Sequence, residues 1–231
     1  MMTLIVATRN AHKLAEIRFI LGDTFRFLTL KDFPSAPAVQ EDAQTFAGNA
    51  TKKSVELAHW LSSHDSRFTF HASRPTFALA DDSGLEVDAL NGAPGVHSAR
   101  FAALDTAGAA NSPDAENIAK LLRLLKDVPL EKRAARFRCV LALTPIFPQA
   151  PHHASPACAA NEFEIQTELF EGVCEGRIGF SPIGAGGFGY DPLFIPNGYE
   201  QSFAELGEAT KNKFSHRARA LEKLKRHLDK L

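Results

Sequence analysis

Two adjacent carboxylates, Asp81 and Asp82, follow an apolar run and precede Ser83 and Gly84. Because neighbouring carboxylates repel each other, such a pair indicates either a solvated turn or a site where a bound cation or proton relieves the repulsion. If the preceding strand lies in an open α/β sheet and ends at this pair, the carboxylates stand where such sheets bind their ligands. A divalent cation is then the expected partner of the pair.

A second polar group follows the first apolar run, in the stretch ATRNAHK from Ala7 to Lys13. A helix that begins here would present free backbone N–H groups to an anion. The side chains of Thr8, Asn10 and Lys13 add a hydroxyl, an amide and an ammonium group. The stretch lacks the glycine spacing of a P-loop or of a dinucleotide fingerprint. It is therefore typical of either an anion-binding loop or an ordinary capped helix.

Two further stretches carry groups that a ligand could use. Glu41 stands just before a predicted helix that carries Lys53, although both residues are also typical of a solvated helix face. The segment 184–194 reads GAGGFGYDPLF, in which glycines clear space while Phe188 and Tyr190 offer flat rings to a base. A glycine-rich hairpin around a buried aromatic residue explains that segment equally well.

The elements that would position these groups alternate between strands and helices. Short β-branched or alternating runs predict strands, and apolar residues spaced three or four positions apart predict helices. The last helix has Ser215 as its expected N-cap, which places His216 and Arg217 in its first turn and Leu231 at the end of its apolar face. The pattern predicts a mixed α/β fold, with strands at 3–7, 26–30, 75–80, 135–143 and 162–170 and helices at 11–21, 45–61, 114–126 and from 216 onward.

Length and composition bound the class of protein. The 231 residues are 45% apolar, which suffices for one large α/β domain, as we expect, or for two small ones. The 26 basic and 27 acidic side chains give a net charge of −1, so no overall positive field favours nucleic acid or a membrane as a partner. Three widely spaced cysteines, with no apolar leader and no membrane-length apolar run, predict a cytoplasmic protein with reduced thiols.

Two stretches interrupt the alternating pattern, at 62–76 and at 144–161. Both are rich in Pro, Ala, Ser and His and lack a sustained period. We therefore expect surface loops that resemble insertions, and no domain linker. His152, His153 and Cys158 in the second stretch bring no fourth ligand, so a structural metal site is not expected there.

Taken together, an anion loop, an acidic site, an aromatic platform and a helix that opens on Ser-His-Arg describe a nucleotide site. The order of the motifs resembles the inosine/xanthosine triphosphate pyrophosphatase family, in the stretches ATRNAHKLAEI, EDAQTFAGNA, ADDSGLEVDALNGAPGVHSARFA, GGFGYDPLF and KNKFSHRARAL. The resemblance spans nearly the whole chain. It implies an elongated mixed sheet flanked by helices, two lobes around a deep substrate cleft, and a homodimer. It also implies Mg²⁺-dependent hydrolysis of the purine triphosphates ITP, dITP and XTP to the monophosphate and pyrophosphate.

The resemblance also implies roles for individual residues. Asp82 and Glu41 are expected to hold the metal, with Asp82 accepting a proton from the water that attacks the α-phosphorus and Asp81 lying behind the two ligands. Arg217 is expected to present two donors to the 6-oxo group of the base, and Phe188 to stack on it. The implied substrate-binding residues are Thr8, Asn10, Lys13, Lys53, Ser83, Phe188, Gly189, Tyr190, Asp191, Lys211, His216 and Arg217.

Some features leave alternatives open. Arg9 and His12 occupy positions that are often glycine in the family, so the conformation of the first loop is not fixed by the resemblance. Arg100 either contacts the cleft or braces the turn after the stretch GAPGVHSAR. One alternative is a related pyrophosphatase that acts on modified pyrimidines. The combination of FGYD with SHR is not expected in such an enzyme. A protein that binds nucleotides without catalysis would not need the carboxylates.

Overall fold

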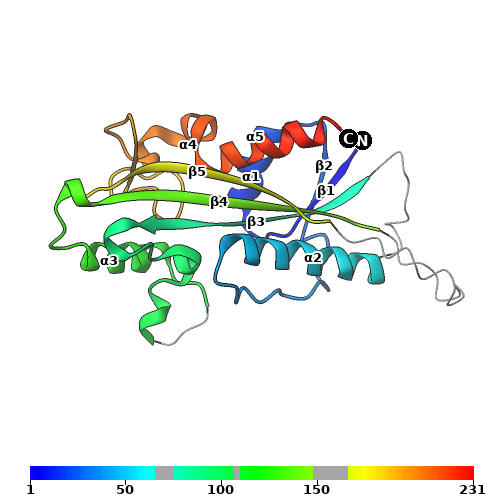
Figure 1. The fold of residues 1–231 in the computed structure, drawn as a ribbon, viewed down its shortest axis with the longest axis horizontal. Coiled ribbons are helices and arrows are strands. Elements are labelled where there is room, and N and C mark those ends of the chain that lie inside the picture. Colours follow the sequence, from blue (N-terminus) through cyan, green and yellow to red (C-terminus); the bar gives the residue numbers. More distant parts are fainter. Residues whose placement is uncertain (66–74, 107–109, 148–165) are drawn as a thin grey trace, which may run out of the picture.

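The computed structural model describes residues 1–65, 75–106, 110–147 and 166–231. The molecule is elongated, and a six-stranded sheet runs along its length (Figure 1). In the strand order β2-β1-β3-β4-β5-β6, β1 is parallel to both of its neighbours and the other pairs are antiparallel. The predicted mixed α/β fold is confirmed. The strands are β1 (Thr3–Val6), β2 (Arg26–Thr29), β3 (Thr76–Val87), β4 (Ala134–Pro145), β5 (Glu168–Ile178) and β6 (Phe194–Pro196).

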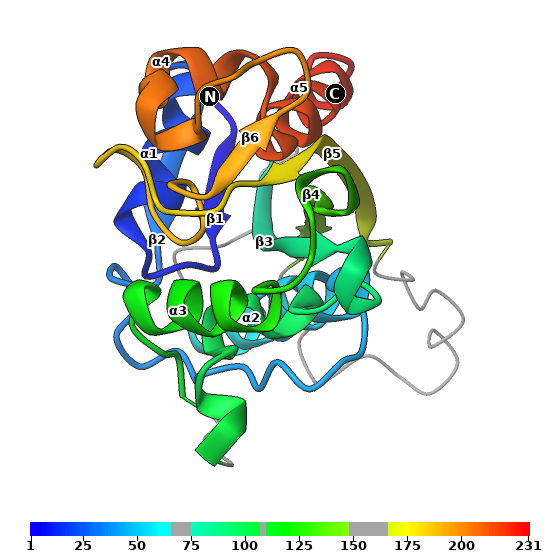
Figure 2. The ribbon, with the colours of Figure 1, turned by 90° about the vertical axis from the view of Figure 1, so that its left-hand side faces the viewer.

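Helices cover both faces of the sheet. In Figures 1 and 2, α1, α4 and α5 lie on one face and α2 and α3 on the other. None of the helices in the described ranges combines the length and the apolar character that crossing a membrane requires. The helices are α1 (Ala11–Leu21), α2 (Phe46–His64), α3 (Asp114–Leu124), α4 (Phe203–Phe214) and α5 (His216–Leu228), with 3₁₀ turns at Asp88–Leu90, Gly95–Arg100, Ala103–Thr106 and Leu130–Lys132.

Side-chain caps fix where four of these helices begin, and Ser202 is the cap of α4. The Asn10 side chain accepts hydrogen bonds from the backbone N–H groups of His12 and Lys13, and so starts α1. Thr45 caps α2 and Ser215 caps α5 in the same manner. Each cap satisfies N–H groups that have no partner inside the helix. This confirms the predicted N-cap at Ser215. It also confirms that His216 and Arg217 lie in the first turn of α5.

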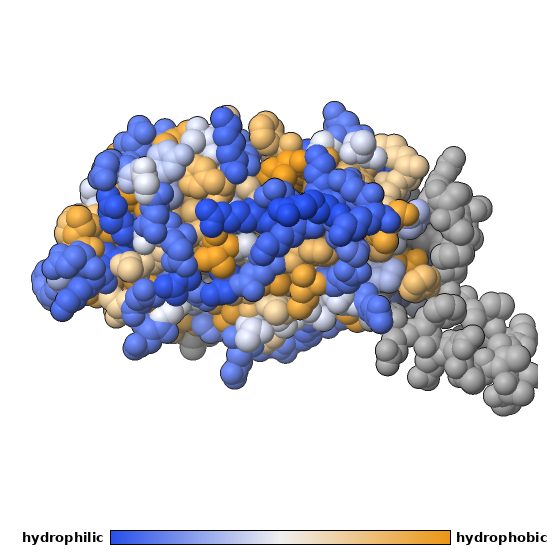
Figure 3. Space-filling view, turned by 45° about the horizontal axis from the view of Figure 1, so that its top comes forward, coloured by the Kyte–Doolittle hydropathy of each residue, from blue (hydrophilic) through white to orange (hydrophobic). Residues whose placement is uncertain are grey.

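The outer and inner faces of α5 show why this helix packs on the sheet. Leu221, Leu224 and Leu228 are buried against β4 and β5, and burying each is worth about 1.5–3 kcal/mol. The opposite side of α5 carries charged residues such as Lys223 and Arg226, and hydrophilic side chains run across this face of the molecule (Figure 3). The apolar stripe therefore orients the first turn of α5 toward the interior.

The sequence interpretation was wrong about several element ends. β3 does not stop at the aspartate pair, because its residues pair with β4 without a break up to Val87. Leu231 lies beyond the end of α5 and is exposed. Helix α4 was not predicted, since Gly207 (φ 72°) interrupts its helical backbone and its apolar residues follow no sustained period.

Within the described residues, the two predicted surface loops are shorter than expected, because regular elements extend into both of them. Residues 62–64 complete α2, Thr76 opens β3, and residues 144–145 end β4. The rest of the first loop from 66 to 74 lies outside the described residues. So do residues 148–165, which include His152, His153, Cys158 and the first part of the strand predicted at 162–170.

Candidate active site

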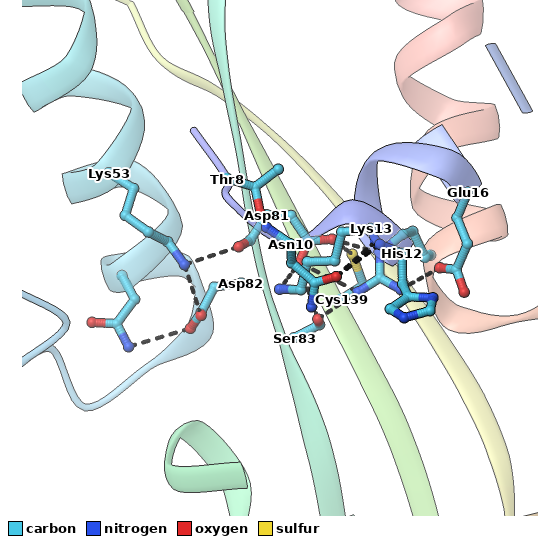
Figure 4. Close-up of polar contacts among 12 residues, drawn as sticks. Thr8, Asn10, His12, Lys13, Glu16, Lys53, Asp81, Asp82, Ser83 and Cys139 are labelled. Atoms are coloured by element: carbon cyan, nitrogen blue, oxygen red, sulfur yellow. Dashed lines mark hydrogen bonds and ion pairs between the residues drawn. The ribbon is translucent and has the colours of Figure 1, made fainter. Parts of the chain in front are cut away.

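The adjacent aspartates point to opposite faces of the sheet, because successive side chains of a strand alternate. Asp81 faces α1 and α5, where it contacts Lys13 and Arg217. Asp82 faces α2, where it contacts Lys53. Figure 4 shows the two carboxylates on either side of β3. The two adjacent carboxylates, which suggested one acidic site in the sequence, therefore lie in two different environments.

A cavity of about 520 Å³ opens where the parallel strands end. Val6, the last residue of β1, pairs with Leu79, so Asp81 and Asp82 lie just beyond the carboxyl end of β1 although β3 continues. The pair therefore lies at the carboxyl-terminal edge of the parallel strands, the edge where the sequence predicted a ligand site. The predicted site residues that line this cavity are Thr8, Asn10, Lys13, Glu41, Lys53, Asp82 and Ser83.

A second cavity of about 210 Å³ adjoins the first, since Asn10, Lys13 and Ser83 line both. Asn111, which the sequence did not single out, also lines both cavities. Every predicted site residue lines one cavity or the other, and their individual roles stay predictions. The predicted residues in the second cavity are Phe188, Gly189, Tyr190, Asp191, Lys211, His216 and Arg217, beside the three that are shared.

Lys53 joins the two carboxylates that were predicted to hold a metal. Its Nζ lies 3.0 Å from Asp82 Oδ1 and 3.3 Å from Glu41 Oε2. Burial raises the pKa of Asp82, despite the opposing charge of Lys53. Burial would also raise the pKa of Glu41, but the charges of Lys53 and Lys13, together with hydrogen bonding to Asp82 and Lys53, outweigh burial and lower that pKa. The Asn49 amide donates to the second oxygen of Asp82 at 3.2 Å.

This acidic end suits Mg²⁺ by its donor chemistry. Mg²⁺ commonly takes one or two carboxylates and fills its other positions with water and phosphate oxygens. Glu41 and Asp82 face the same cavity and supply such a pair. Within residues 1–65, 75–106, 110–147 and 166–231, no three His, Cys, Asp or Glu side chains gather to form a cage for a metal. The residues present therefore fit an ion that is shared with a phosphorylated substrate.

Arg100 belongs to the same end of the cleft. Its Nη2 donates to the backbone carbonyl of Glu41 at 3.0 Å, and the residue lines the first cavity. Of the two roles that the sequence left open, Arg100 lines the cleft, and its side chain braces the segment that carries Glu41 and not the turn that follows Arg100.

Asp81 is a buried junction of hydrogen bonds on the other face. It accepts from Lys13, from Arg217 Nε at 2.8 Å, from the Ser83 hydroxyl at 3.0 Å and from the Cys139 thiol at 3.2 Å. Burial alone would raise its pKa, but Arg217 and Lys13 hold the pKa well below its usual range. Asp81 is therefore a fixed anion that orients two cations. Its carboxylate faces away from Glu41 and Asp82.

The guanidinium of Arg217 is more occupied than we expected. Besides its bond to Asp81 through Nε, its Nη2 donates to Ser83 Oγ at 2.8 Å and its Nη1 donates to Glu16. The prediction that its fork presents two donors to the base is wrong, because buried partners take most of its N–H groups. Glu16 itself escaped the sequence interpretation. Its three-residue spacing from Lys13 on one helix face was the only signal.

The aromatic end of the cleft centres on Phe188. Its ring stacks on that of His12, with centroids 5.6 Å apart, and Lys211 Nζ lies 4.8 Å from the Phe188 centroid. Asp191 holds this segment by accepting from Lys211 Nζ at 2.7 Å and from the Phe188 N–H at 3.0 Å. Gly187 (φ 75°) is required beside it, since a Cβ there would collide with the Asp191 carboxylate.

Tyr190 does not offer its ring to a base, contrary to the sequence interpretation. It is 3% exposed, and its hydroxyl donates to the Ser98 carbonyl at 2.9 Å. The neighbouring Gly189 N–H donates to Asp114 at the start of α3. Tyr190 and Gly189 therefore tie the aromatic segment to the opposite side of the cleft, and Phe188 is left as its stacking ring.

His216 is buried at the base end in its neutral form. Its ring stacks on Phe137 at 4.7 Å, and burial together with the charge of Arg217 lowers its pKa well below the usual value. Its Nδ1 is buried without a hydrogen-bond partner among the described residues. Since an unpaired buried nitrogen is costly, this atom marks a position that a ligand or water can satisfy.

Comparison with known proteins matches this arrangement to one family. The sequence profile of the Ham1 family covers residues 4–227. A dITP/XTP pyrophosphatase from Shouchella clausii is 41% identical over 98% of this chain and 96% of its own, and one from Geobacter sulfurreducens is 44% identical over 99% and 97%. The structure of a HAM1 protein from Coxiella burnetii aligns over 100% of both chains, with 35% identity and a TM-score of 0.76.

Proposed function

The chain belongs to the Ham1 family, and we propose that it hydrolyses ITP, dITP and XTP to the nucleoside monophosphate and pyrophosphate. The observation that carries this proposal is the pair of adjoining cavities, one lined by lysines and carboxylates and the other by Phe188 and buried donors. The first suits a charged triphosphate and the second suits a flat base. The names of the relatives at 41–44% identity support the same activity.

Mg²⁺ is the cofactor that we propose for the acidic end, with Glu41 and Asp82 as its protein ligands. When bound, the ion would neutralise phosphate charge and lower the pKa of water. Lys53 Nζ stands between the two carboxylates, at 3.0 Å from Asp82 and 3.3 Å from Glu41. Its ammonium group thus holds both carboxylates close together.

The chain's own residues account for the remaining requirements of the reaction. Asp82 accepts a proton from the water whose oxygen attacks the α-phosphorus, while the bond from that phosphorus to the bridging oxygen breaks and pyrophosphate leaves. Lys13 and Lys53 stabilise the negative charge that grows on the departing oxygens. Asp81 fixes Lys13 at the mouth of the first cavity. Because these groups are in place before substrate binds, little reorganisation is needed during the reaction.

Base selection belongs to the second cavity. The 6-oxo group of inosine and xanthosine accepts hydrogen bonds where adenine presents an amino donor. Lys211, His216 and Arg217 line that cavity and supply donors, which adenine would leave unpaired. Phe188 supplies a stacking face that any purine can use.

Release of pyrophosphate from ITP tests the proposal. We expect turnover with Mg²⁺, loss of turnover with EDTA, and recovery when excess Mg²⁺ is added back. ATP should be a poor substrate in the same assay. Turnover of a modified pyrimidine triphosphate in preference to ITP would indicate the alternative pyrophosphatase. Tight binding of ITP without pyrophosphate release would indicate a nucleotide-binding protein without catalysis.

The proposal includes a homodimer that works in the cytoplasm. Its supports are the family resemblance, the near-neutral net charge of −1 and the two buried free thiols, Cys139 and Cys174. Light scattering of the purified chain measures the mass, and a monomer at micromolar concentration would contradict the dimer.

A further inference from the structure

The two adjoining cavities meet at a seam, which is defined by the residues that line both of them. In a nucleoside triphosphate the sugar joins the base to the α-phosphate. If the phosphates occupy the first cavity and the base occupies the second, the sugar has to cross this seam. The side chains of the seam are then the ones that face the sugar hydroxyls. The seam residues are Asn10, Lys13, Ser83, Ala99 and Asn111.

Three of the polar seam residues are already held by protein partners. Asn10 Oδ1 accepts from two backbone N–H groups, at 2.9 and 3.2 Å, and so caps α1. Lys13 pairs with Asp81, and an ammonium group has no acceptor. The Ser83 hydroxyl donates to Asp81 at 3.0 Å and accepts from Arg217 at 2.8 Å. None of the three therefore offers a free donor and a free acceptor together.

Asn111 differs from these three residues. It is exposed, and within the described ranges its side chain has no hydrogen bond to the protein. Its amide carries both an NH₂ donor and a carbonyl acceptor. A sugar hydroxyl is likewise both a donor and an acceptor, so the amide can bind it in either direction. Ala99, the remaining seam residue, has no polar side-chain group.

The backbone beside Asn111 is held in place although the side chain is exposed. The Ser112 N–H donates to the Ala99 carbonyl at 3.0 Å, and the Ser112 hydroxyl accepts from the Ala103 N–H at 2.9 Å. The amide of Asn117, which is 2% exposed, donates to the carbonyls of Ala99 and Ser112 at 3.3 and 3.4 Å. This segment leads into α3, which lies on the face of the sheet opposite to α1 (Figure 2). Asn111 is thus fixed on the side of the cleft opposite to the phosphate loop.

We propose that Asn111 binds the sugar of the substrate, through a hydrogen bond between its side-chain amide and the 3′-hydroxyl. This inference rests on the proposed function. The proposed substrates include ribonucleotides and a deoxyribonucleotide, and the 3′-hydroxyl is the sugar hydroxyl that they share. A contact with the 2′-hydroxyl would be lost on dITP. A contact with the 3′-hydroxyl lets one site accept both kinds of sugar.

The experiment compares dITP with 2′,3′-dideoxy-ITP, which differs from dITP only by the missing 3′-hydroxyl. For the wild type we expect kcat/KM to be about three- to tenfold higher for dITP, the range that one hydrogen bond between neutral groups produces. Asn111→Ala should lower kcat/KM for dITP by the same factor and leave that for 2′,3′-dideoxy-ITP within about twofold. Both rates come from one preparation, so their ratio does not depend on the folded fraction.

Two further variants separate this contact from a structural role. Asn111→Asp keeps an acceptor at the same place, so dITP should stay preferred, although the added negative charge should lower kcat/KM for both triphosphates. Asn197→Ala is the matched control, because Asn197 is also an exposed asparagine but lines neither cavity. It should keep the wild-type ratio.

Equal kcat/KM values for the two triphosphates in the wild type would overturn the inference. A preference for dITP that survives in Asn111→Ala would overturn it as well, since the 3′-hydroxyl would then be bound elsewhere. Loss of the preference in Asn111→Asp would also contradict the proposed contact. A wild-type protein that releases no pyrophosphate from ITP or dITP would instead refute the proposed function itself.

Discussion

Asp81→Asn and Asp82→Asn should separate stability from turnover, although the two residues are neighbours. Asp81 accepts from the buried Arg217, the half-buried Lys13, a hydroxyl and a thiol, and an amide there would place an NH₂ group against these donors. Breaking a buried ion pair by removing one partner costs about 3–5 kcal/mol. For a chain of this size each kcal/mol lowers Tm by roughly 2–4 °C, so Asp81→Asn should lose about 6–20 °C.

Asp82→Asn should leave Tm nearly unchanged and abolish turnover. Lys53 keeps Glu41 and the Asp81 backbone carbonyl as acceptors when the Asp82 charge is removed. Burial already raises the pKa of Asp82, which means that its ionised form is less favourable in the folded than in the unfolded chain. An uncharged amide of the same size therefore removes little stability. It does remove the group that we propose as proton acceptor and metal ligand.

The pH dependence of the free energy of unfolding tests these assignments independently, because Asp81 and Asp82 should change it in opposite directions. The folded pKa of Asp81 lies below its unfolded value, so its ionised form stabilises the protein above about pH 4 and that contribution is lost as the pH falls further. The stability gap between wild type and Asp81→Asn should be full at pH 7 and shrink below about pH 4. Asp82 has the opposite sign, since its raised pKa makes ionisation unfavourable as the pH rises.

Scanning calorimetry and pyrophosphate release on both variants measure these effects. A melting temperature that falls more for Asp82→Asn than for Asp81→Asn would show that the assignment of the two faces of β3 is wrong. Near-normal turnover in a folded Asp82→Asn protein would remove Asp82 from the proposed chemistry.

Three further substitutions test the two ends of the cleft. Lys13→Met should lower kcat/KM for ITP and ATP by the same factor, roughly tenfold or more, because every nucleotide shares the phosphates; a changed ITP-to-ATP ratio would place Lys13 at the base. Phe188→Ala should raise KM for all purine triphosphates by an amount equivalent to about 1–3 kcal/mol, and a loss confined to ITP would contradict a stacking role. Tyr190→Phe leaves the buried Ser98 carbonyl without its donor and should cost about 1–3 kcal/mol in urea unfolding with no change in base preference, which kcat/KM for ITP and ATP checks.

Much of the fold followed from local pattern in the sequence. Periodicity located α1, α2 and α5, and the cap at Ser215 placed His216 and Arg217 correctly because capping depends on neighbouring residues alone. The motifs also named residues that the chain does gather around one cleft. The end of β3 was misplaced because polar residues in a strand interior resemble a turn when the partner strand is unknown.

The functions of the individual charges could not be predicted in the same way. Whether Arg217 offers two donors or one depends on Glu16, which lies 201 positions earlier in the chain. Helical periodicity describes one element, whereas a hydrogen-bond count needs the partners that the folded chain brings from other elements. Tyr190 illustrates the same limit, because its ring packs in a hydrophobic core and its hydroxyl donates to the carbonyl of Ser98.

The alternation of β3 explains why the Asp-Asp-Ser sequence can serve a nucleotide site without the repulsion that adjacent carboxylates suggest. Asp81 and Ser83 share one face, where they contact Arg217 and Asp81 also contacts Lys13, while Asp82 faces α2 and Lys53. Each carboxylate therefore has its own counter-charge, and the sheet separates the fixed anion from the titratable one. Shifting the pairing of β3 by one residue would exchange these faces and put the fixed anion in the acidic end of the cleft. The continuous pairing of β3 with β4 fixes this register, and it is therefore as necessary to the proposed chemistry as the carboxylates are.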